Sequence, residues 1–545
     1  MNKKKKKNIK TKHHLYRKQR NKRKQDPRPK LTYTLPNIPL AAPSAHEHAL
    51  YREHQAIHEL KNTLVHHAIV QLKNLKRNKK YQHAKRTIAV LGKELAAEKK
   101  KKPKNRDARK IARLERHIAD AKAYTKEVLT ALGFDKNSFE KHLNAQRKQQ
   151  YAKIVGADAG QKVADAVWQG VEDVLYGKGE RLHYEKWDDP RSISGKSLNS
   201  GINLYRENGK PAGIVYRKRF IPFKRALNAY ETEALTTGAL RYVEVCPIRF
   251  SDGYHWYARF VLHGKVPAKG HKLSRKRGGL DVGTSTVAFA SPTIAEMRVL
   301  GGEPKDYDER IAELSRRIDE SMRATNPGYY NADDAIKKRS RDANGKLAKH
   351  SWRLSAHCKA MKVRKSLLYR KKAVTLKQSH CELANLMASH AGIICTETMN
   401  WAGLAKRAKR ARDEKTGHEK SRKRYGKSIG SHAPAAFVSV LAWRLLTLGG
   451  KLEFVNTYSF RASQLDHFTG ECAKVRLSQR WKEVAGERVQ RDLYSAFLLW
   501  HADASLEHAD VTWCGLDFPR FVARQGEFLS RARESGLYRN SCFGF

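Results

Sequence analysis

Apolar residues between positions 46 and 190 recur at three- and four-residue steps, the spacing of one face of an α-helix. Two runs carry the pattern clearly: Ile57, Leu60, Leu64, Ala68, Leu72 and Leu75, then Ile111, Leu114, Ile118, Ala121, Val128 and Leu132. The segment between them, Lys99 to Lys104, is strongly basic. We therefore expect a helical domain over residues 46–190. It would be either a bundle with solvated outer faces or a clamp for a nucleic-acid duplex.

The period changes to two in residues 191–275, where apolar and polar residues alternate as in half-buried strands. Asn208-Gly209 and Asp252-Gly253 are turn pairs that predict two hairpins. On the second hairpin, Tyr257 and Arg259 share the face opposite Trp256, so we expect them to point outward. A short strand signal around Tyr33, within residues 31–45, is expected to help close a small β-barrel. The helical domain would then be an insertion within that barrel.

Charge changes the picture more than any other compositional feature. The chain of 545 residues carries 110 Lys and Arg against 54 Asp and Glu, a formal net charge of +56. Residues 1–30 alone hold 15 Lys or Arg, which predicts a disordered basic arm that either grips phosphates or is a solvated tail. An excess of this size opposes compaction unless a polyanion neutralises it. Nucleic acid is therefore the expected partner.

Other classes of protein fit less well. A membrane surface is the weaker alternative, because the most apolar segment, Ala433 to Leu448, is short and contains Arg444. The seven cysteines are odd in number and no two lie within four residues of each other, which excludes a CxxC zinc ribbon and argues against a disulfide scaffold. No apolar segment follows the Lys-rich start, so we expect no secretory signal and a location in the reducing cytoplasm.

Three acids stand in contexts that suggest chemistry. Asp281 lies in Gly278-Gly279-Leu280-Asp281-Val282-Gly283, a strand followed by a small turn that also occurs in nucleotide-binding ATPases. Glu397 ends an apolar strand, where a solvated terminus is the ordinary explanation. Asp492 opens a helix with an apolar stripe, where the helix dipole favours an acid. Each signal is weak alone.

Together the three acids are more specific, because two strand ends and a helix start can meet at one edge of a sheet. Three carboxylates in one place need cations, and Mg²⁺ prefers oxygen ligands while keeping several waters. Two such ions activate a water and stabilise the leaving oxygen of a phosphodiester. In a chain with a net charge of +56, this arrangement predicts hydrolysis of nucleic acid.

The order Gly-Leu-Asp-Val-Gly, an apolar strand into Thr396-Glu397, and Arg491-Asp492 followed by Ala496 resembles the three RuvC motifs of the transposon-encoded TnpB proteins and their relatives, the compact type V CRISPR effectors. The resemblance implies that Asp281, Glu397 and Asp492 are the catalytic, Mg²⁺-binding acids. It also implies a guide RNA and a target DNA as partners, with one or two protein copies per guide left open. The fold it implies is multidomain α+β: a wedge-type barrel with an inserted recognition-type helical domain, then an RNase H-like nuclease domain.

In domain terms, the nuclease is expected in two parts, residues 276–465 and 488–510, with an insertion at 466–487 and a C-terminal tail at 511–545. A basic stretch after Glu397, Lys406 to Lys427, has eleven Lys or Arg against three acids. Expected nucleic-acid contacts comprise Tyr257, Arg259, Lys406, Arg407, Lys409, Arg410 and Arg491.

Two features depart from the family. The interval 464–490 offers only Cys472 where the family usually has a four-cysteine zinc ribbon, so we expect no zinc. Tyr494 stands where the family often has Asn. The favoured function is an RNA-guided, Mg²⁺-dependent DNA endonuclease of the RuvC type. The alternatives are an RNA-guided DNA-binding protein that does not cut, a guide-free nuclease of the transposase or resolvase type, and a structural RNA-binding protein.

Overall fold

The computed structural model describes residues 28–545 except 102–104, 186–191, 195–200, 303–304, 339–349, 407–424, 475, 477, 536–542 and 545. The basic arm predicted over residues 1–30 therefore falls almost entirely outside the described residues. The described chain divides into two compact units, Thr32–Gly264 and Lys265–Phe545, and each is considered by itself.

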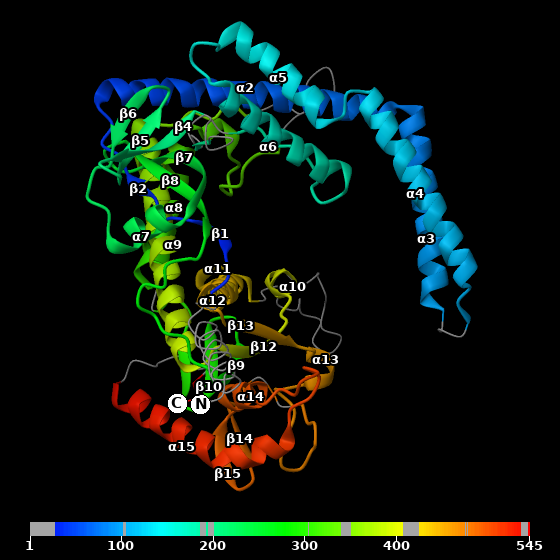
Figure 1. Cartoon of the computed structure of the whole chain (residues 1–545), viewed down its shortest axis with the longest axis vertical. Helices are drawn as coiled ribbons and strands as arrows, with labels where there is room; N and C mark the ends of the chain where they lie inside the picture. Colours follow the sequence, from blue (N-terminus) through cyan, green and yellow to red (C-terminus); the bar gives the residue numbers. More distant parts are fainter. Residues whose placement is uncertain are drawn as a thin grey trace, which may run out of the picture. The chain divides into compact units, whose positions relative to one another are not determined.

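The strands of the unit Thr32–Gly264 form two antiparallel sheets (Figure 1). The first has the order β1-β8-β7-β3, with β2 also paired to β8. Its strands are β1 (Leu31–Thr34), β2 (Ile38–Pro39), β3 (Ile193–Ser194), β7 (Ala239–Arg249) and β8 (Tyr254–Gly264). The second sheet contains β4 (Ile202–Glu207), β5 (Lys210–Tyr216) and β6 (Arg219–Pro222). Both predicted hairpins are confirmed, as β4–β5 and β7–β8.

The prediction of a closed barrel is wrong for the residues that the structure describes. The described strands form two separate sheets, which are joined by an isolated bridge between Leu40 and Phe223 and by neighbouring backbone hydrogen bonds rather than by a continuous ladder around a cylinder. The strand near Tyr33 is confirmed as β1, and it pairs with β8 as the edge of an open sheet.

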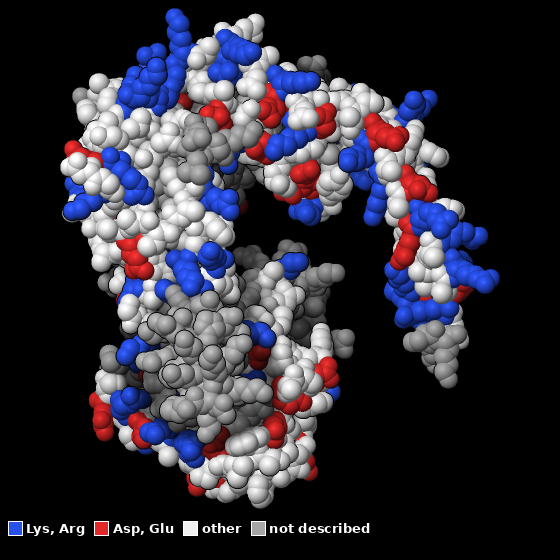
Figure 2. Space-filling view, viewed as in Figure 1, with Lys and Arg blue, Asp and Glu red and all other residues white. Residues whose placement is uncertain are grey.

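Helices lie between β2 and β3 in sequence, as the insertion hypothesis requires. They are α2 (Ser44–Arg77), α3 (Lys79–Lys100), α4 (Ala108–Ala131), α5 (Lys136–Gln150) and α6 (Ala157–Leu175), and the shorter α7 (Ala229–Thr237) precedes β7. On α2 the predicted face is the buried one, with Leu60, Leu64 and Ala68 at most 2% exposed. Helices α3 and α4 pack against each other as a hairpin whose far end carries exposed Lys and Arg side chains (Figure 2).

A five-stranded mixed sheet forms the centre of the unit Lys265–Phe545. Its order is β11-β10-β9-β12-β13. The strands are β9 (Arg277–Val282), β10 (Thr286–Ser291), β11 (Ile294–Val299), β12 (Ile393–Glu397) and β13 (Lys451–Val455). The first three pair antiparallel, whereas β9, β12 and β13 run parallel. Parallel neighbours bring their carboxyl ends to the same edge of the sheet.

Helices cover both faces of this sheet, which explains why its strands are buried on both sides. One core contains Leu280, Phe289 and Ile394 with apolar residues of α9 (Ala356–His390) and α12 (Pro434–Leu448). The other contains Ala288 and Cys395 with residues of α14 (Arg491–Trp500) and α15 (Val511–Ser535). The remaining elements are α8 (Lys305–Thr325), η2 (Pro327–Tyr329), α10 (Trp401–Ala405), α11 (Gly426–His432), α13 (Thr457–Phe460), β14 (Trp481–Val484) and β15 (Glu487–Gln490).

The segment expected as a C-terminal tail is instead a long helix of the core. Cys514, Phe518, Phe521 and Phe528 of α15 are all at most 6% exposed and pack with α14. Their three- and four-residue spacing is the signal that indicates a buried helix face.

The apolar segment Gly426–Leu448 is long and apolar enough to cross a membrane by length and composition. In the structure it is two helices, α11 and α12, separated by Ala433 in the left-handed conformation. Phe437, Leu441 and Leu445 on α12 are fully buried against the sheet and α9. The apolar character of α12 is thus explained by its place in the core.

Candidate active site

Asp281 and Glu397 occupy matching positions on two neighbouring parallel strands. Leu280 on β9 pairs with Thr396 on β12, so the acid that follows each lies one residue further along its own strand. Thr396 also donates its side-chain hydroxyl to the backbone oxygen of Leu280 at 2.8 Å. Residues in register on adjacent strands point to the same face. The two carboxylates therefore share one face at the carboxyl end of the sheet.

Asp492 reaches the same place from a helix that lies directly on β9. Gln490 caps α14 by accepting a hydrogen bond from the Leu493 backbone N–H at 2.8 Å. The helix approaches so closely that a Cβ on Gly279 would lie 2.0 Å from the Ala496 backbone oxygen. Glycine at position 279 is thus what allows the helix of Asp492 and the strand of Asp281 to touch.

Asp281 interacts electrostatically with both other acids. Burial, then repulsion from Asp492 and from Glu397, raises the pKa of Asp281 well above its usual range, and Arg491 opposes this. Burial raises the pKa of Glu397 as well, and a hydrogen bond from the Ala462 backbone N–H opposes it. The three acids thus lie on three different elements at the same end of the sheet.

Arginine side chains compensate Asp492. The Arg491 guanidinium donates to Asp492 Oδ1 from Nη2 at 2.9 Å and from Nε at 3.1 Å. Its Nη1 also donates to the backbone oxygens of Arg476 and Gln479, at 3.3 and 3.2 Å. Arg480 lies further away, 3.8 Å from Asp492 Oδ2. Arg491, expected as a nucleic-acid contact, is therefore buried in a structural role that ties the 476–480 segment to the third acid.

The donor chemistry of the three acids suits a hard divalent cation, because carboxylate oxygens are what Mg²⁺ prefers. The raised pKa values of Asp281 and Glu397 point the same way, since both groups lack enough positive charge around them. Within the described residues, however, no three His, Cys, Asp or Glu side chains are arranged closely enough to form a metal-binding group. The three acids thus fit Mg²⁺ by ligand type. The Asp492 carboxylate accepts hydrogen bonds from Arg491 and is not part of a preformed metal-binding group.

A tyrosine and a histidine join the insertion to the catalytic helix. The Tyr494 side chain is fully buried, and its hydroxyl oxygen accepts the His467 backbone N–H at 3.0 Å. The same hydroxyl lies 2.7 Å from Nδ1 of His467. Burial lowers the pKa of His467, and a neutral imidazole can accept from or donate to the hydroxyl through Nδ1, depending on its tautomer. The Tyr494 side chain thus anchors the segment around His467 to α14.

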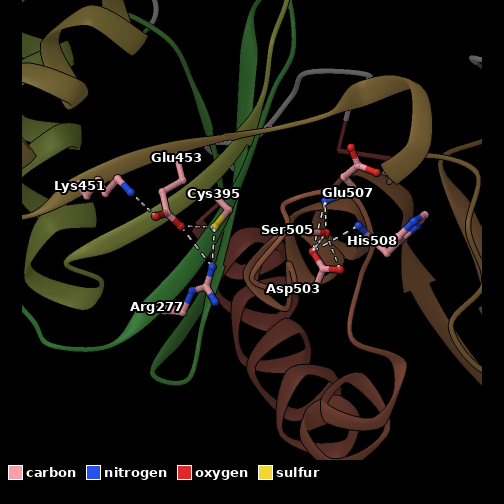
Figure 3. A network of polar contacts seen from close by, with 8 residues as sticks. All are labelled: Arg277, Cys395, Lys451, Glu453, Asp503, Ser505, Glu507 and His508. Atoms are coloured by element: carbon pink, nitrogen blue, oxygen red, sulfur yellow. Dashed lines mark hydrogen bonds and ion pairs between the residues drawn. The ribbon is translucent and has the colours of Figure 1, made fainter. Parts of the chain in front are cut away.

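A second polar network supports the strand that carries Glu397 (Figure 3). Arg277 on β9 donates to the Cys395 sulfur at 3.2 Å and to Glu453 on β13 at 3.3 Å. Lys451 donates to the other oxygen of Glu453 at 2.7 Å. Figure 3 also shows the turn after α14, where Asp503 accepts from Ser505 and from backbone N–H groups. Strands β9, β12 and β13 are thus cross-linked, with Arg277 and Lys451 at the amino ends of their strands.

The residues predicted to contact nucleic acid differ in their exposure and in their contacts within the protein. Tyr257 is half-buried on the face of β8 opposite the buried Trp256, as alternation predicts. Arg259 shares that face but donates to Asn37 and Glu244, at 3.0 and 3.2 Å. Lys406 is exposed at the end of α10. Arg407, Lys409 and Arg410 lie outside the described residues.

Sequence reasoning missed several residues around the acids. Arg480, the Ala462 backbone N–H, and the anchoring contact of His467 with Tyr494 are placed by tertiary structure alone. The sequence offered only weak signals for these contacts. Arg491 precedes Asp492 and His467 lies in the insertion, but basic residues and histidines are common throughout this chain.

No protein-family model and no curated protein matches this sequence. Several solved structures are similar in the course of the chain. A cryo-EM structure of a Cas12f1–sgRNA–target DNA complex has 10% identity and a TM-score of 0.41, covering 86% of this chain and 98% of that chain. A Cas12f ternary complex has 12% identity and a TM-score of 0.23, with coverages of 86% and 98%. A Cas12i–crRNA–dsDNA complex has 8% identity and a TM-score of 0.26, with coverages of 88% and 65%.

Proposed function

We propose that this protein is an RNA-guided, Mg²⁺-dependent DNA endonuclease with an RNase H-like nuclease domain of the RuvC type. The observation that carries the proposal is the convergence of Asp281, Glu397 and Asp492 at one sheet edge, in a chain with a net charge of +56. The partners we propose are a guide RNA and a target DNA, which are also the components named for the Cas12f1 complex.

The arrangement divides the work between two kinds of side chain. Asp281, Glu397 and Asp492 would hold Mg²⁺, which when bound supplies an activated water and stabilises the leaving oxygen of the phosphodiester. Lys and Arg elsewhere grip the phosphate backbone, which gives affinity without reading sequence. Pairing with the guide then selects the target, as in other RNA-guided nucleases.

The residues around the acids set their positions before any cation binds. Arg491 fixes the carboxylate of Asp492, and the Ala462 backbone N–H fixes that of Glu397. Asp281 is left as the group with the least favourable charge environment. Removal of any acid takes away a proposed ligand without touching the phosphate-binding surface.

The experiment begins with the chain purified together with its bound RNA, and that RNA is sequenced. DNA matching the recovered RNA is then incubated with the complex and Mg²⁺. We expect cutting by the wild type, and loss of cutting of at least about 10²-fold for Asp281→Ala, with DNA affinity retained. Glu527→Ala is the matched control, because Glu527 is a 58% exposed carboxylate on α15.

Cutting by Asp281→Ala at the wild-type rate would refute the site. Recovery of a discrete RNA without any cutting would favour the RNA-guided binding protein that does not cut. Mg²⁺-dependent cutting that needs no RNA would favour the guide-free nuclease. Each alternative therefore has its own outcome.

A further inference from the structure

Residues 456–470, here called the strap, connect two of the acids. The strap begins directly after Val455, the β13 residue in register with Glu397. Its Ala462 backbone N–H donates to Glu397, and its His467 is fixed to the Tyr494 hydroxyl, two residues after Asp492 on α14. The strap therefore runs from one acid to the other and is attached at both ends.

Two aromatic rings on the strap face solvent. The Tyr458 side chain is 90% exposed and that of Phe468 is 73% exposed. Their neighbours Phe460 and His467 are buried, so the strap is packed against the core on one side. Both rings thus project from a backbone that is held in place.

Hydrogen bonds order the backbone at each ring. The Tyr458 backbone N–H donates to the Asn456 side chain at 3.2 Å, and Asn456 is itself bound to the Leu506 oxygen at 2.9 Å. The Phe468 backbone N–H donates to Asp466 Oδ1 at 2.9 Å. An ordered backbone matters because only the side-chain torsions of each ring then remain to be fixed when a ligand stacks on it.

Leaving both rings in water forgoes roughly 1.5–3 kcal/mol of burial for each. Single exposed aromatic side chains are common and need no explanation. Two exposed aromatic side chains on one anchored segment, which runs between the elements of Glu397 and Asp492, are a more specific pattern. The arrangement indicates a ligand that covers the rings when it binds.

The surroundings of the rings decide what kind of ligand fits. Arg461 is exposed, and its Nε donates to the Tyr458 backbone oxygen at 3.1 Å. Ser463 and Thr469 are exposed as well, so polar side chains accompany the rings along the strap. A protein partner would require a continuous apolar patch. A flat, polar-edged base needs only the face of each ring, with a cation nearby for its phosphate.

We propose that Tyr458 and Phe468 stack on unpaired nucleobases of the DNA strand that lies across the acids, with Arg461 close to its backbone. This inference rests on the proposed function and adds two residues that contact the DNA substrate beside the acids. Stacking tolerates any sequence because every base offers a π-face. Bases in an intact duplex are covered by their neighbours, so the rings favour a strand that has already been opened.

Binding of short fluorescent DNA single strands tests this inference without any cutting. All variants carry Asp281→Ala, and anisotropy is measured at raised ionic strength to weaken the phosphate term. Tyr458→Ala and Phe468→Ala are each expected to lower affinity by about 5- to 150-fold. Tyr458→Phe should bind as the parent does, because it keeps the ring. Trp513→Ala, which removes a 59% exposed aromatic on α15, is the matched control and should change nothing.

An abasic walk then locates the stacked bases. The same oligonucleotide is made with one base removed at each position in turn. At one position, removing the base should lower the affinity of the parent but not that of Tyr458→Ala. In the variant the ring that stacked on that base is already gone, so removing the base costs nothing more. Equal affinities for the parent and both alanine variants would overturn the inference. The inference would also be overturned if removing a base lowered the affinity of the parent and of the alanine variants by the same amount at every position.

Failure of the inference and failure of the proposed function are distinguishable. If the wild type cuts DNA while the alanine variants bind single strands normally, the stacking inference falls and the nuclease stands. If the rings bind bases but the wild type never cuts, the proposal of a nuclease falls.

Discussion

The hydroxyl oxygen of Tyr494 lies 2.7 Å from Nδ1 of His467, and both side chains are buried. This contact links α14, the helix of Asp492, to the segment that follows β13. A hydrogen bond between two buried side chains thus fixes that segment to the helix.

Tyr494→Phe keeps the ring and removes only the hydroxyl. It leaves the His467 backbone N–H and Nδ1 without their buried partner, so we expect a loss of about 1–3 kcal/mol in the free energy of unfolding. Chemical denaturation measures the loss. Tyr458→Phe is the matched control, because that hydroxyl is on a 90% exposed side chain, and its stability should not change. Equal stability of both variants would contradict the anchoring role.

Gly279→Ala is expected to be far more damaging than its size suggests. The added Cβ would lie 2.0 Å from the Ala496 backbone oxygen and 2.2 Å from the Trp500 backbone nitrogen, and backbone cannot swing away. We expect a loss of about 3 kcal/mol or more in stability and loss of cutting, because α14 must move off β9. Gly92→Ala is the control, since nothing lies within 4 Å of its added Cβ, and thermal unfolding should show it unchanged or slightly stabilised.

Zinc is expected not to copurify in stoichiometric amount. Cys472 is the only cysteine in the 464–490 interval and is exposed, so a structural zinc ion would lack its usual ligands there. Elemental analysis of the purified protein, before and after treatment with a chelator, measures this. One tightly held zinc ion per chain, or unfolding on chelation, would refute the prediction.

Acid should destabilise the unit Thr32–Gly264 through His54. This side chain packs 5.1 Å from the Trp256 ring, and burial lowers its pKa to about 3. Between the ordinary value near 6.5 and about 3, the unfolded chain binds a proton that the folded chain does not, so stability falls as the pH drops through this window. The loss is about 2 kcal/mol at about pH 5.

His54→Phe should flatten this acid dependence, because the aromatic contact is kept and the titrating group is removed. The measurement is the denaturation midpoint near pH 7 and near pH 5. A control substitution at His83, which is exposed on α3, should leave the dependence as in the wild type. An unchanged slope in His54→Phe would show that other groups cause the acid sensitivity.

Short sequence patterns correctly predicted those turns and helices that depend only on neighbouring residues. Asn208-Gly209 specified the turn between β4 and β5, and both residues have positive φ. The apolar face of α2 was read from its spacing.

The closed barrel and the C-terminal tail were wrong because both depend on distant partners. A barrel closes only if the two edge strands of the sheet pair with each other or with a second sheet. The hydrophobic periodicity of a strand does not say which strand lies beside it. For the candidate site, the positions of the three acids near two strand ends and at a helix start were predictable, because such ends are visible in the sequence. The roles of Arg480, Arg491 and His467 were not, because they depend on contacts between segments far apart in the chain.

The separation of Asp281 on β9 from Asp492 on α14 also has a consequence during synthesis. The sheet strands β9 to β13 leave the ribosome well before α14, and Gly279 stays open until that helix arrives to cover it. A nascent chain thus lacks a complete set of acids until α14 has been made. The order of the segments therefore keeps the proposed cutting site incomplete while the basic residues that precede α14 are already present.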